Sequence, residues 1–274
     1  NKDIFNAAGL PNPPKNWSEV KDYSKKTTLP GPGGGILRSG IALGRSKNIP
    51  LFREIFSLIM LQQGTNNEEP FLTRSEALES TLRFYTDFGN PKMTSSYLWN
   101  IALPEPREMF LQGKLAMMLD FVSYSENLKI RNPHLSFGVS PAPQLENAEA
   151  PTHFAEIRGI TATRAAEKYS TAAWKFAYWL AGNSPGLTMA SLHVSAPARR
   201  DLLQDPALKK MDLFPLAVET SLNAKRFHDP VREASSQLLS EVIESAANGN
   251  SISDAATALN SKIKRVYQDL RNLN

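Results

Sequence analysis

The sequence contains no cysteine, and this absence excludes disulfide bonds, thiolate metal sites and cysteine nucleophiles from the chain. Long apolar runs are also missing. The longest, at 55–61, is interrupted by Ser57, whereas a membrane-spanning helix needs about 20 apolar residues. The chain opens at Asn1 without a start Met, a basic n-region or an apolar h-region. We therefore expect no transmembrane helix, and we expect the native start to have been removed or to lie upstream.

Positive charge is in small excess and is not concentrated. Thirty-one Lys and Arg residues stand against 27 Asp and Glu residues, which gives a net charge of +4. The densest basic stretches are short and far apart, at 25–26, 199–200 and 262–265. Nucleic-acid-binding modules instead cluster positive charge on one face, so we expect no nucleic-acid partner. The 274 residues, 41% apolar and 21% charged, are typical of one large or two ordinary globular domains.

Signatures of catalysis and metal binding are scarce as well. The four histidines, at 134, 153, 193 and 228, have no second ligand three or four residues away, so the sequence predicts no zinc site. There is no Gly-x-Ser-x-Gly nucleophile motif. The glycine-rich stretch at 29–35 lacks the lysine and the hydroxyl residue of a phosphate-binding loop. We expect neither a metal nor a cofactor.

Hydrophobic periodicity predicts strands first and helices later. Strands are expected at 36–43, 115–120, 135–139 and 154–163. Helices are expected at 17–27, 52–63, 74–88, 124–130, 165–181, 186–193, 199–204, 215–227, 232–247 and 253–270. Asn16 or Ser18 is the expected cap of the first of these helices. The alternation followed by a helical stretch indicates an α/β sheet domain wrapped by helices.

Aromatic residues fall into two groups. Four of them lie within the strong helical pattern at 165–181, where we expect most to be core: Trp174, Phe176, Tyr178 and Trp179. Trp99 and Tyr124 lie instead in polar turns rich in Ser and Asn, where an aromatic ring covers a sheet edge or faces a ligand. Rings flanked by amides, hydroxyls and a carboxylate suit sugars, which have apolar C–H faces and polar rims.

Seven short segments follow one another in a recognisable order. They are NKDIF, AGL and PPKNWSEV within 1–20, GIALG at 40–44, FLQGKLAM at 110–117, NPHLSFGVSPAP at 132–143 and AAWKF at 172–176. In this order they resemble extracellular solute-binding proteins of ABC transporters, of the maltose-binding type (family 1). The resemblance implies an α/β, periplasmic-binding-protein-like, two-lobed flytrap fold with a helix-rich second lobe. It also implies closure about a ligand by hinge motion and delivery to an ABC permease, without chemistry.

The resemblance also implies a domain organisation and a location. The chain corresponds to everything after roughly the first third of the family, so the first lobe is expected to be incomplete. Residues 1–153 form the first part of the second lobe, 154–201 cross the hinge and supply the rest of the first lobe, and 202–274 return to the second. The expected location is extracytoplasmic, with a lipid anchor, where one exists, upstream of this chain.

Candidate ligand-binding residues follow from the same correspondence, position by position. They are Asn48 in the loop after 36–43, Asp120, Ser123 and Tyr124 after 115–119, and Arg158 and Gly159 in the crossing segment. Ser123 and Tyr124 stand where the family usually has a cleft tryptophan, and Ser236 stands where another is common, which argues against a maltodextrin ligand. Trp99 and Phe227 are the candidates to replace those rings.

The expected roles are specific. Tyr124 and Trp99 would stack on the ligand, Asp120 and Asn48 would hydrogen-bond it, and Arg158 would orient a hydroxyl or a carboxylate. A sugar is the favoured ligand, and an oligopeptide or a polyol remains open.

Two other classes of function also remain open. A glycoside hydrolase would use Asp120 with Glu156, which requires the two carboxylates to lie about 5–10 Å apart. A non-catalytic helical interaction module is favoured by the long helices after residue 165.

Overall fold

The computed structural model describes residues 1–65, 75–93, 95–227 and 229–273. The chain divides into two compact units. Unit 1 comprises Asn1–Asp120, His134–Phe154 and Lys225–Asn274, and unit 2 comprises Phe121–Pro133 and Ala155–Ala224. Unit 2 extends to Ala224. The reason is packing, since Leu202, Leu208 and Phe214 share one core with Ala190.

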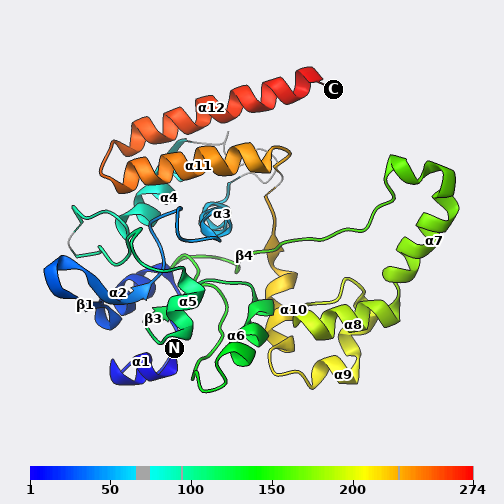
Figure 1. Ribbon diagram of the computed structural model, residues 1–274, viewed down its shortest axis with the longest axis horizontal. Helices are drawn as coiled ribbons and strands as arrows, with labels where there is room; N and C mark the ends of the chain where they lie inside the picture. Colours follow the sequence, from blue (N-terminus) through cyan, green and yellow to red (C-terminus); the bar gives the residue numbers. More distant parts are fainter. Residues whose placement is uncertain (66–74, 94, 228, 274) are drawn as a thin grey trace. The chain divides into compact units, whose positions relative to one another are not determined.

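A small sheet forms the centre of unit 1 (Figure 1). Its strands are β1 (Leu29–Pro30), β2 (Ile36–Ile41) and β3 (Leu115–Met117), in the order β1-β2-β3. β1 runs antiparallel to β2, and β3 runs parallel to β2, with Ser39 opposite Leu115 and Ile41 opposite Met117. The predicted strands at 36–43 and 115–120 are therefore confirmed, each somewhat shorter than expected.

The helices of unit 1 are α1 (Lys2–Ala7), α2 (Trp17–Thr27), α3 (Phe52–Gln62), α4 (Ser75–Asp87), α5 (Pro106–Leu111), α11 (Arg232–Ala247) and α12 (Ile252–Leu273). Asn16 caps α2 as predicted, because its side chain accepts the Glu19 N–H at 2.8 Å. The apolar run at 55–61 makes α3 a buried core helix, with every residue from Ile55 to Leu61 inside. α11 and α12 lie side by side and pack on α4 (Figure 1).

Unit 2 is helical. Its elements are η2 (Val122–Tyr124), α6 (Ser125–Arg131), η3 (Arg164–Tyr169), α7 (Ser170–Leu180), α8 (Asn183–His193), η4 (Arg200–Gln204), α9 (Pro206–Lys209) and α10 (Phe214–Leu222). Where the chain passes between the units, β4 (His153–Phe154) and β5 (Ala224–Lys225) pair as a two-stranded sheet. The helix predicted at 215–227 ends earlier, at Leu222.

Two predicted strands are wrong. Residues 135–139 have no regular structure, and of 154–163 only Phe154 belongs to a strand. A strand needs a neighbouring strand with which it exchanges backbone hydrogen bonds. Among the described residues, no strand pairs with either of these two segments beyond the β4–β5 pair. Alternation of apolar and polar residues is therefore insufficient here, and Ile157 and Ile160 are exposed to solvent.

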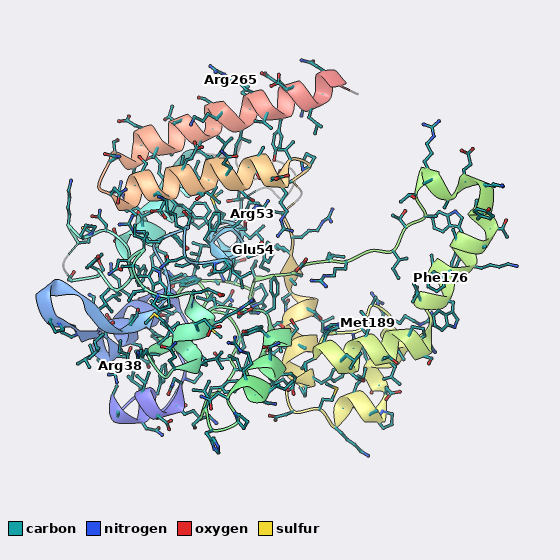
Figure 2. All side chains as sticks on the ribbon, viewed as in Figure 1. Arg38, Arg53, Glu54, Phe176, Met189 and Arg265 are labelled. Atoms are coloured by element: carbon teal, nitrogen blue, oxygen red, sulfur yellow. The ribbon has the colours of Figure 1, made fainter. Side chains whose placement is uncertain are left out.

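The aromatic residues of α7 are outside the core, which corrects the expectation that most are buried. Trp174, Phe176, Tyr178 and Trp179 are 49% to 78% exposed. Figure 2 labels Phe176 on α7 and Met189 on α8, both with exposed side chains. Only Ala177 of α7 is buried. The predicted helix is present, but within the described part of unit 2 it packs through a single narrow face.

Candidate functional site

Parallel strands bring two loops to one edge of the sheet in unit 1. Since β2 and β3 are parallel, the loops that follow them, at 42–51 and 118–120, leave from the same edge, which is where ligands bind in open α/β sheets. The first turn of α5 joins them. Together they line a small depression of about 10 Å³, room for about one water-sized group. Its lining residues are Ile49, Pro50, Leu51, Glu105, Pro106, Arg107, Met118, Leu119 and Asp120.

Asp120 lies in this depression, held by an arginine. Arg107 Nε donates to Asp120 Oδ2 at 2.7 Å, and Arg107 Nη2 donates to Oδ1 at 3.0 Å, so the guanidinium grips both carboxylate oxygens. The Asp120 side chain is 9% exposed and that of Arg107 is 30% exposed. The pair is a two-point ion pair of zero net charge that keeps partial access to solvent.

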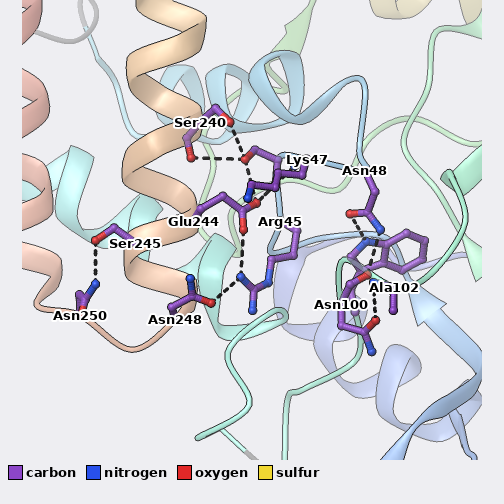
Figure 3. Close-up of polar contacts among 12 residues, drawn as sticks. Arg45, Lys47, Asn48, Asn100, Ala102, Ser240, Glu244, Ser245, Asn248 and Asn250 are labelled. Carbon is purple, nitrogen blue, oxygen red and sulfur yellow. Dashed lines mark hydrogen bonds and ion pairs between the residues drawn. The ribbon is translucent and has the colours of Figure 1, made fainter.

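The loop after β2 is fastened to α11 by Glu244 (Figure 3). One carboxylate oxygen accepts the Ser46 N–H at 2.8 Å and the Ser46 hydroxyl at 2.9 Å, and the other accepts Arg45 Nη1 at 2.9 Å. Asn248 also accepts from Arg45 Nη1, at 2.8 Å. Burial favours a higher pKa for the Glu244 carboxyl, but the hydrogen bonds from Ser46, Arg45 and the Lys47 backbone outweigh burial and lower the pKa.

Backbone geometry fixes the same loop at its start. Gly44 has φ +99°, and a Cβ there would lie 2.2 Å from the Gly89 backbone nitrogen, so only glycine fits. The buried Tyr85 hydroxyl donates to the Arg45 carbonyl oxygen at 2.9 Å, and burial raises the pKa of that phenol. The loop that lines one edge of the depression is therefore held in a fixed conformation.

Trp99 and Asn48 form a structural pair, which corrects the expectation that they face a ligand. Trp99 is fully buried, and its indole N–H donates to Asn48 Oδ1 at 3.1 Å. The Asn48 amide nitrogen donates to the carbonyl oxygen of Asn100 at 2.9 Å (Figure 3). It also donates to the carbonyl oxygen of Leu103 at 2.9 Å. A fully buried ring offers no stacking surface. Both side chains instead brace the loop that lines the depression.

The remaining sequence candidates are distributed between the units. Phe227, in unit 1, is buried. Ser123 is exposed and Tyr124 half-buried, both in unit 2, as are the exposed Arg158 and Gly159. Arg158 Nε lies 3.6 Å from Glu156 Oε1.

The two carboxylates that a glycoside hydrolase would use belong to different units. Glu156 lies in unit 2 beside Arg158, whereas Asp120 lies in unit 1 with Arg107. Each carboxylate thus has its own arginine partner.

Arg107 was not singled out from the sequence, although its guanidinium pairs with Asp120 in the depression. It follows Pro104 and Pro106, which mark a helix start, and local periodicity carries no signal that its side chain reaches Asp120, thirteen residues later. Glu244 was missed for the same reason, because its partners lie nearly 200 residues away. Such pairs become visible only when the elements that carry them pack together.

The described part of the chain has neither a metal-binding cluster nor a membrane-spanning helix. It contains no cluster of three or more His, Cys, Asp or Glu residues that could hold a metal ion. His134 and His193 are exposed, His153 is buried, and His228 lies outside the described residues. No helix among the described residues is long and apolar enough to span a bilayer.

Comparison with known proteins places this geometry in context. Residues 1–186 match the family model described as bacterial extracellular solute-binding protein. A binding protein from Brucella abortus (strain 2308) is 29% identical over 147 residues, which is 52% of this chain and 34% of that protein. The chain thus covers about a third of the length of this relative.

Solved structures share the fold across nearly the whole chain. A maltose/maltodextrin-binding domain from Bdellovibrio bacteriovorus, bound to maltotriose, has 17% identity and a TM-score of 0.70, covering 94% of this chain and 67% of that one. UgpB from Mycobacterium tuberculosis, in complex with glycerophosphocholine, has 15% identity and a TM-score of 0.74, covering 98% and 68%. CpMnBP1 with mannobiose bound has 18% identity and a TM-score of 0.68, covering 96% and 67%.

Proposed function

Because the chain belongs to the bacterial extracellular solute-binding proteins, we propose that it captures a small carbohydrate and delivers it to an ABC importer. Its fold is periplasmic-binding-protein-like and rich in helices. The observation that carries the proposal is the Arg107–Asp120 ion pair in a hydroxyl-sized depression at the carboxyl ends of two parallel strands.

The lining of the depression suits a sugar. The partly exposed apolar side chains of Leu51 and Met118 can contact the C–H face of a sugar, while the ion pair accepts hydrogen bonds from its hydroxyls and donates to them. Among the solved structures of the same fold, two were obtained with maltotriose or mannobiose bound. A neutral, polyhydroxylated ligand is the class that best matches both facts.

The candidate contact residues are proposed for each unit by itself. From unit 1, Asp120 would accept a ligand hydroxyl. From unit 2, Tyr124 would stack on the ring, Ser123 would hydrogen-bond it, and Arg158, beside Gly159, would orient a further oxygen. Asn48, Trp99 and Phe227 are left out of the contact set because their side chains are engaged or buried.

The proposed cycle follows from binding alone. A ligand favours one conformation of the protein only to the extent that it binds that conformation more tightly. The partners are then a small-molecule ligand and the permease subunits, with no nucleic acid. The proposed location is extracytoplasmic, in the periplasm or at the outer face of the cytoplasmic membrane.

A thermal-shift and calorimetric screen of the full-length protein tests the proposal. The panel contains maltotriose, mannobiose, glycerophosphocholine, amino acids and short peptides. A ligand at 100 times its Kd should add about 2.7 kcal/mol to the free energy of unfolding. Saturable binding of a saccharide supports the proposal, and a folded protein that binds none of the saccharides contradicts it.

Matched variants locate the site within the screen. Tyr124→Ala should weaken saccharide binding at least tenfold without changing Tm, because a stacked ring is lost and the fold is not. Tyr169→Ala, an exposed tyrosine of the same unit, is the control and should bind as the parent protein does. Equal affinity of the two variants would remove Tyr124 from the site.

One observation favours the second candidate function, an interaction module. The exposed aromatic residues of α7 form an apolar surface of the kind that marks protein contacts. A pulldown with the full-length protein, in which Trp179→Ala abolishes capture of a permease subunit or another defined protein while saccharide binding is absent, would support this candidate in place of the first.

A further inference from the structure

We propose that α3 holds the unit 1 ends of two crossing segments, and that Arg53 and Gln62 at its two ends are positioning residues for ligand binding. For its longer passage through unit 2, the chain leaves unit 1 after Phe154, at the first crossing, and comes back at Lys225, at the return crossing. The inference rests on the proposed function and goes beyond it by naming residues that act on binding through the backbone.

The return crossing is held by the carboxylate of Asp229, whose side chain is 2% exposed. Its Oδ2 accepts Arg53 Nη2 at 2.7 Å and also the Ser235 hydroxyl. Its Oδ1 accepts the Val231 N–H at 3.0 Å and the Tyr267 hydroxyl at 3.3 Å. Three of these donors come from α3, α11 and α12, so one buried carboxylate ties the returning chain to three helices of unit 1.

The ion pair of Arg53 and Asp229 is better suited to placing the chain than to adding stability. Desolvation of two buried charges offsets much of their attraction, so such a pair contributes little more than an apolar pair would. Arg53 Nε is also buried, with no hydrogen-bond partner among the described residues, which costs further free energy. A second ion pair repeats the link, because Arg232 Nη2 donates to Glu54 Oε1 at 2.6 Å. Figure 2 labels Arg53 and Glu54 on α3.

The first crossing is held by the amide of Gln62, at the other end of α3. Gln62 Nε2 donates to the carbonyl oxygens of Pro143, at 2.8 Å, and Thr152, at 3.1 Å. Its Oε1 accepts the indole N–H of the buried Trp17 at 2.7 Å, which orients the amide. Thr152 directly precedes β4, which contacts α3 (Figure 1). The end of α3 therefore holds the chain just before it leaves unit 1.

The helix between the two anchors is part of the core. Every residue from Ile55 to Leu61 is buried, and α4 and α11 pack on α3. Arg53 and Gln62 are nine residues apart, which is about 14 Å along a helix axis. Because this spacer is rigid, the two crossings start from places in unit 1 whose separation is fixed.

Fixed anchors leave fewer conformations for a ligand to order. Binding that rigidifies a protein costs conformational entropy, and a segment that is already ordered reduces this cost. Loosening either anchor should therefore weaken ligand binding although no ligand contact is lost. A purely structural role predicts instead a change in global stability with unchanged affinity.

Hydrogen exchange and saccharide titration of the full-length protein test the first anchor. Gln62→Glu keeps the acceptor for Trp17 and removes both donated hydrogen bonds. Gln63→Glu is the matched control, because Gln63 Nε2 donates to Thr81 Oγ1 on α4. The titrant is maltotriose or mannobiose, whichever binds the parent protein more tightly. The free energy of unfolding of every variant is measured in parallel.

The second anchor is tested in the same way. Asp229→Asn keeps the shape of the side chain and removes its charge. Asp87→Asn, at a carboxylate on α4 that lies 3.7 Å from Lys21 Nζ, is its matched control. Ser235→Ala removes one donor to Asp229 and is the milder variant, which keeps the test decisive if Asp229→Asn does not fold.

The expected pattern is local. Asp229→Asn should speed exchange of the Val231 amide about tenfold, and Gln62→Glu should do the same for the Thr152 amide. Each should weaken saccharide binding about threefold or more, beyond what its change in global stability explains. Ser235→Ala should shift both readouts in the same direction by a smaller factor. The two control variants should keep the parent values.

The contrary outcomes separate the two proposals. If exchange at Thr152 and Val231 keeps its parent rate in the folded variants, α3 does not hold the crossings, and the inference is overturned while the proposed function stands. Faster exchange with unchanged saccharide affinity overturns the positioning role of Arg53 and Gln62 in binding. If the folded parent protein binds neither saccharide, the proposed function fails, and the positioning role fails with it.

Discussion

The two units differ in where they keep their largest side chains. In unit 1, Trp99, Tyr85, Phe56 and Phe88 are fully buried, inside a scaffold of helices around the small sheet. In unit 2, the buried cluster is Ala190, Leu202, Leu208 and Phe214, while the aromatic residues of α7 face solvent. The described part of unit 1 thus buries its largest aromatic side chains, and the described part of unit 2 leaves many of its own exposed.

The sequence of α7 sharpens this difference. Its exposed aromatic residues point in several directions around the helix, a pattern typical of a helix enclosed on all sides. Phe176 and Trp179 instead stack on each other, with ring centroids 5.9 Å apart and planes 18° apart. Full burial of one such ring contributes about 1.5–3 kcal/mol to stability. The described part of unit 2 leaves these rings exposed and gains little of that free energy.

The largest predicted effect contrasts a buried tryptophan with an exposed one. Trp99→Ala should lower the free energy of unfolding by about 3–5 kcal/mol, because it opens a cavity and leaves Asn48 Oδ1 without its donor. Trp179→Ala, at a residue 61% exposed, should change it by about 0.5 kcal/mol or less. Urea unfolding of both variants measures the contrast, and equal losses would show that Trp179 is covered in solution.

The second contrast concerns ion pairs. Asp229 accepts Arg53 Nη2 at 2.7 Å, with side chains 2% and 6% exposed, and also receives the Val231 N–H at 3.0 Å. Asp229→Ala should cost about 3–5 kcal/mol, since it leaves a buried guanidinium without its anion.

The exposed pair of Glu126 and Lys129 on α6 of unit 2 is the control, and Glu126→Ala should cost about 0.5 kcal/mol or less. Chemical denaturation at pH 7 measures both variants. A loss below 1 kcal/mol for Asp229→Ala would mean that water reaches Arg53.

Sequence patterns predicted the elements whose signal is local. The helices at 17–27, 52–63, 232–247 and 253–270 are confirmed within a few residues, because amphipathic periodicity and capping act over one or two turns. The order of short segments correctly indicated the family and the fold. Strands at 135–139 and 154–163 were wrong because a strand depends on a partner elsewhere in the chain.

The candidate site divides in the same way. Asp120 was nominated through the family resemblance, and in the structure it lines a depression at the edge of the sheet. Trp99 was misjudged because its sequence neighbours are polar, whereas its burial depends on Asn48, about 50 residues away. Arg107 carried no local signal. Sequence reasoning thus finds single residues at the ends of elements and misses the partners that packing brings to them.

A third prediction compares a half-buried carboxylate with an exposed one. The folded-state pKa of Glu244 is lowered, so its stabilising contribution is present above the unfolded pKa, about 4.3 for glutamate, and is lost as pH falls through the folded value. Glu244→Gln should cost about 1 kcal/mol at pH 7, since part of the group faces water. The free energy of unfolding of this variant should also fall less than that of the parent protein when the pH is lowered through the acid range.

Asp201 in unit 2 is the control for this pH effect. Its pKa is also lowered, by Arg199, but both side chains are about half exposed and solvent screens the pair. Asp201→Asn should therefore reproduce the parent pH profile in 0.5 M salt, measured by urea unfolding between pH 3 and pH 7. A parent-like profile for Glu244→Gln would show that the loop at Ser46 is not held by this carboxylate.

The smallest expected effect is on α7 itself. Replacing Phe176 and Trp179 together by serine should leave the unfolding free energy of the 274-residue chain within about 0.5 kcal/mol of the parent, because both rings face water. Binding of a hydrophobic dye such as bis-ANS should fall, because the apolar surface is smaller. Leu208→Ala, at a fully buried residue of the same unit, is the positive control and should cost about 2–5 kcal/mol. If the serine pair costs as much as Leu208→Ala, the aromatic face of α7 is buried in solution, and the contrast between the units disappears.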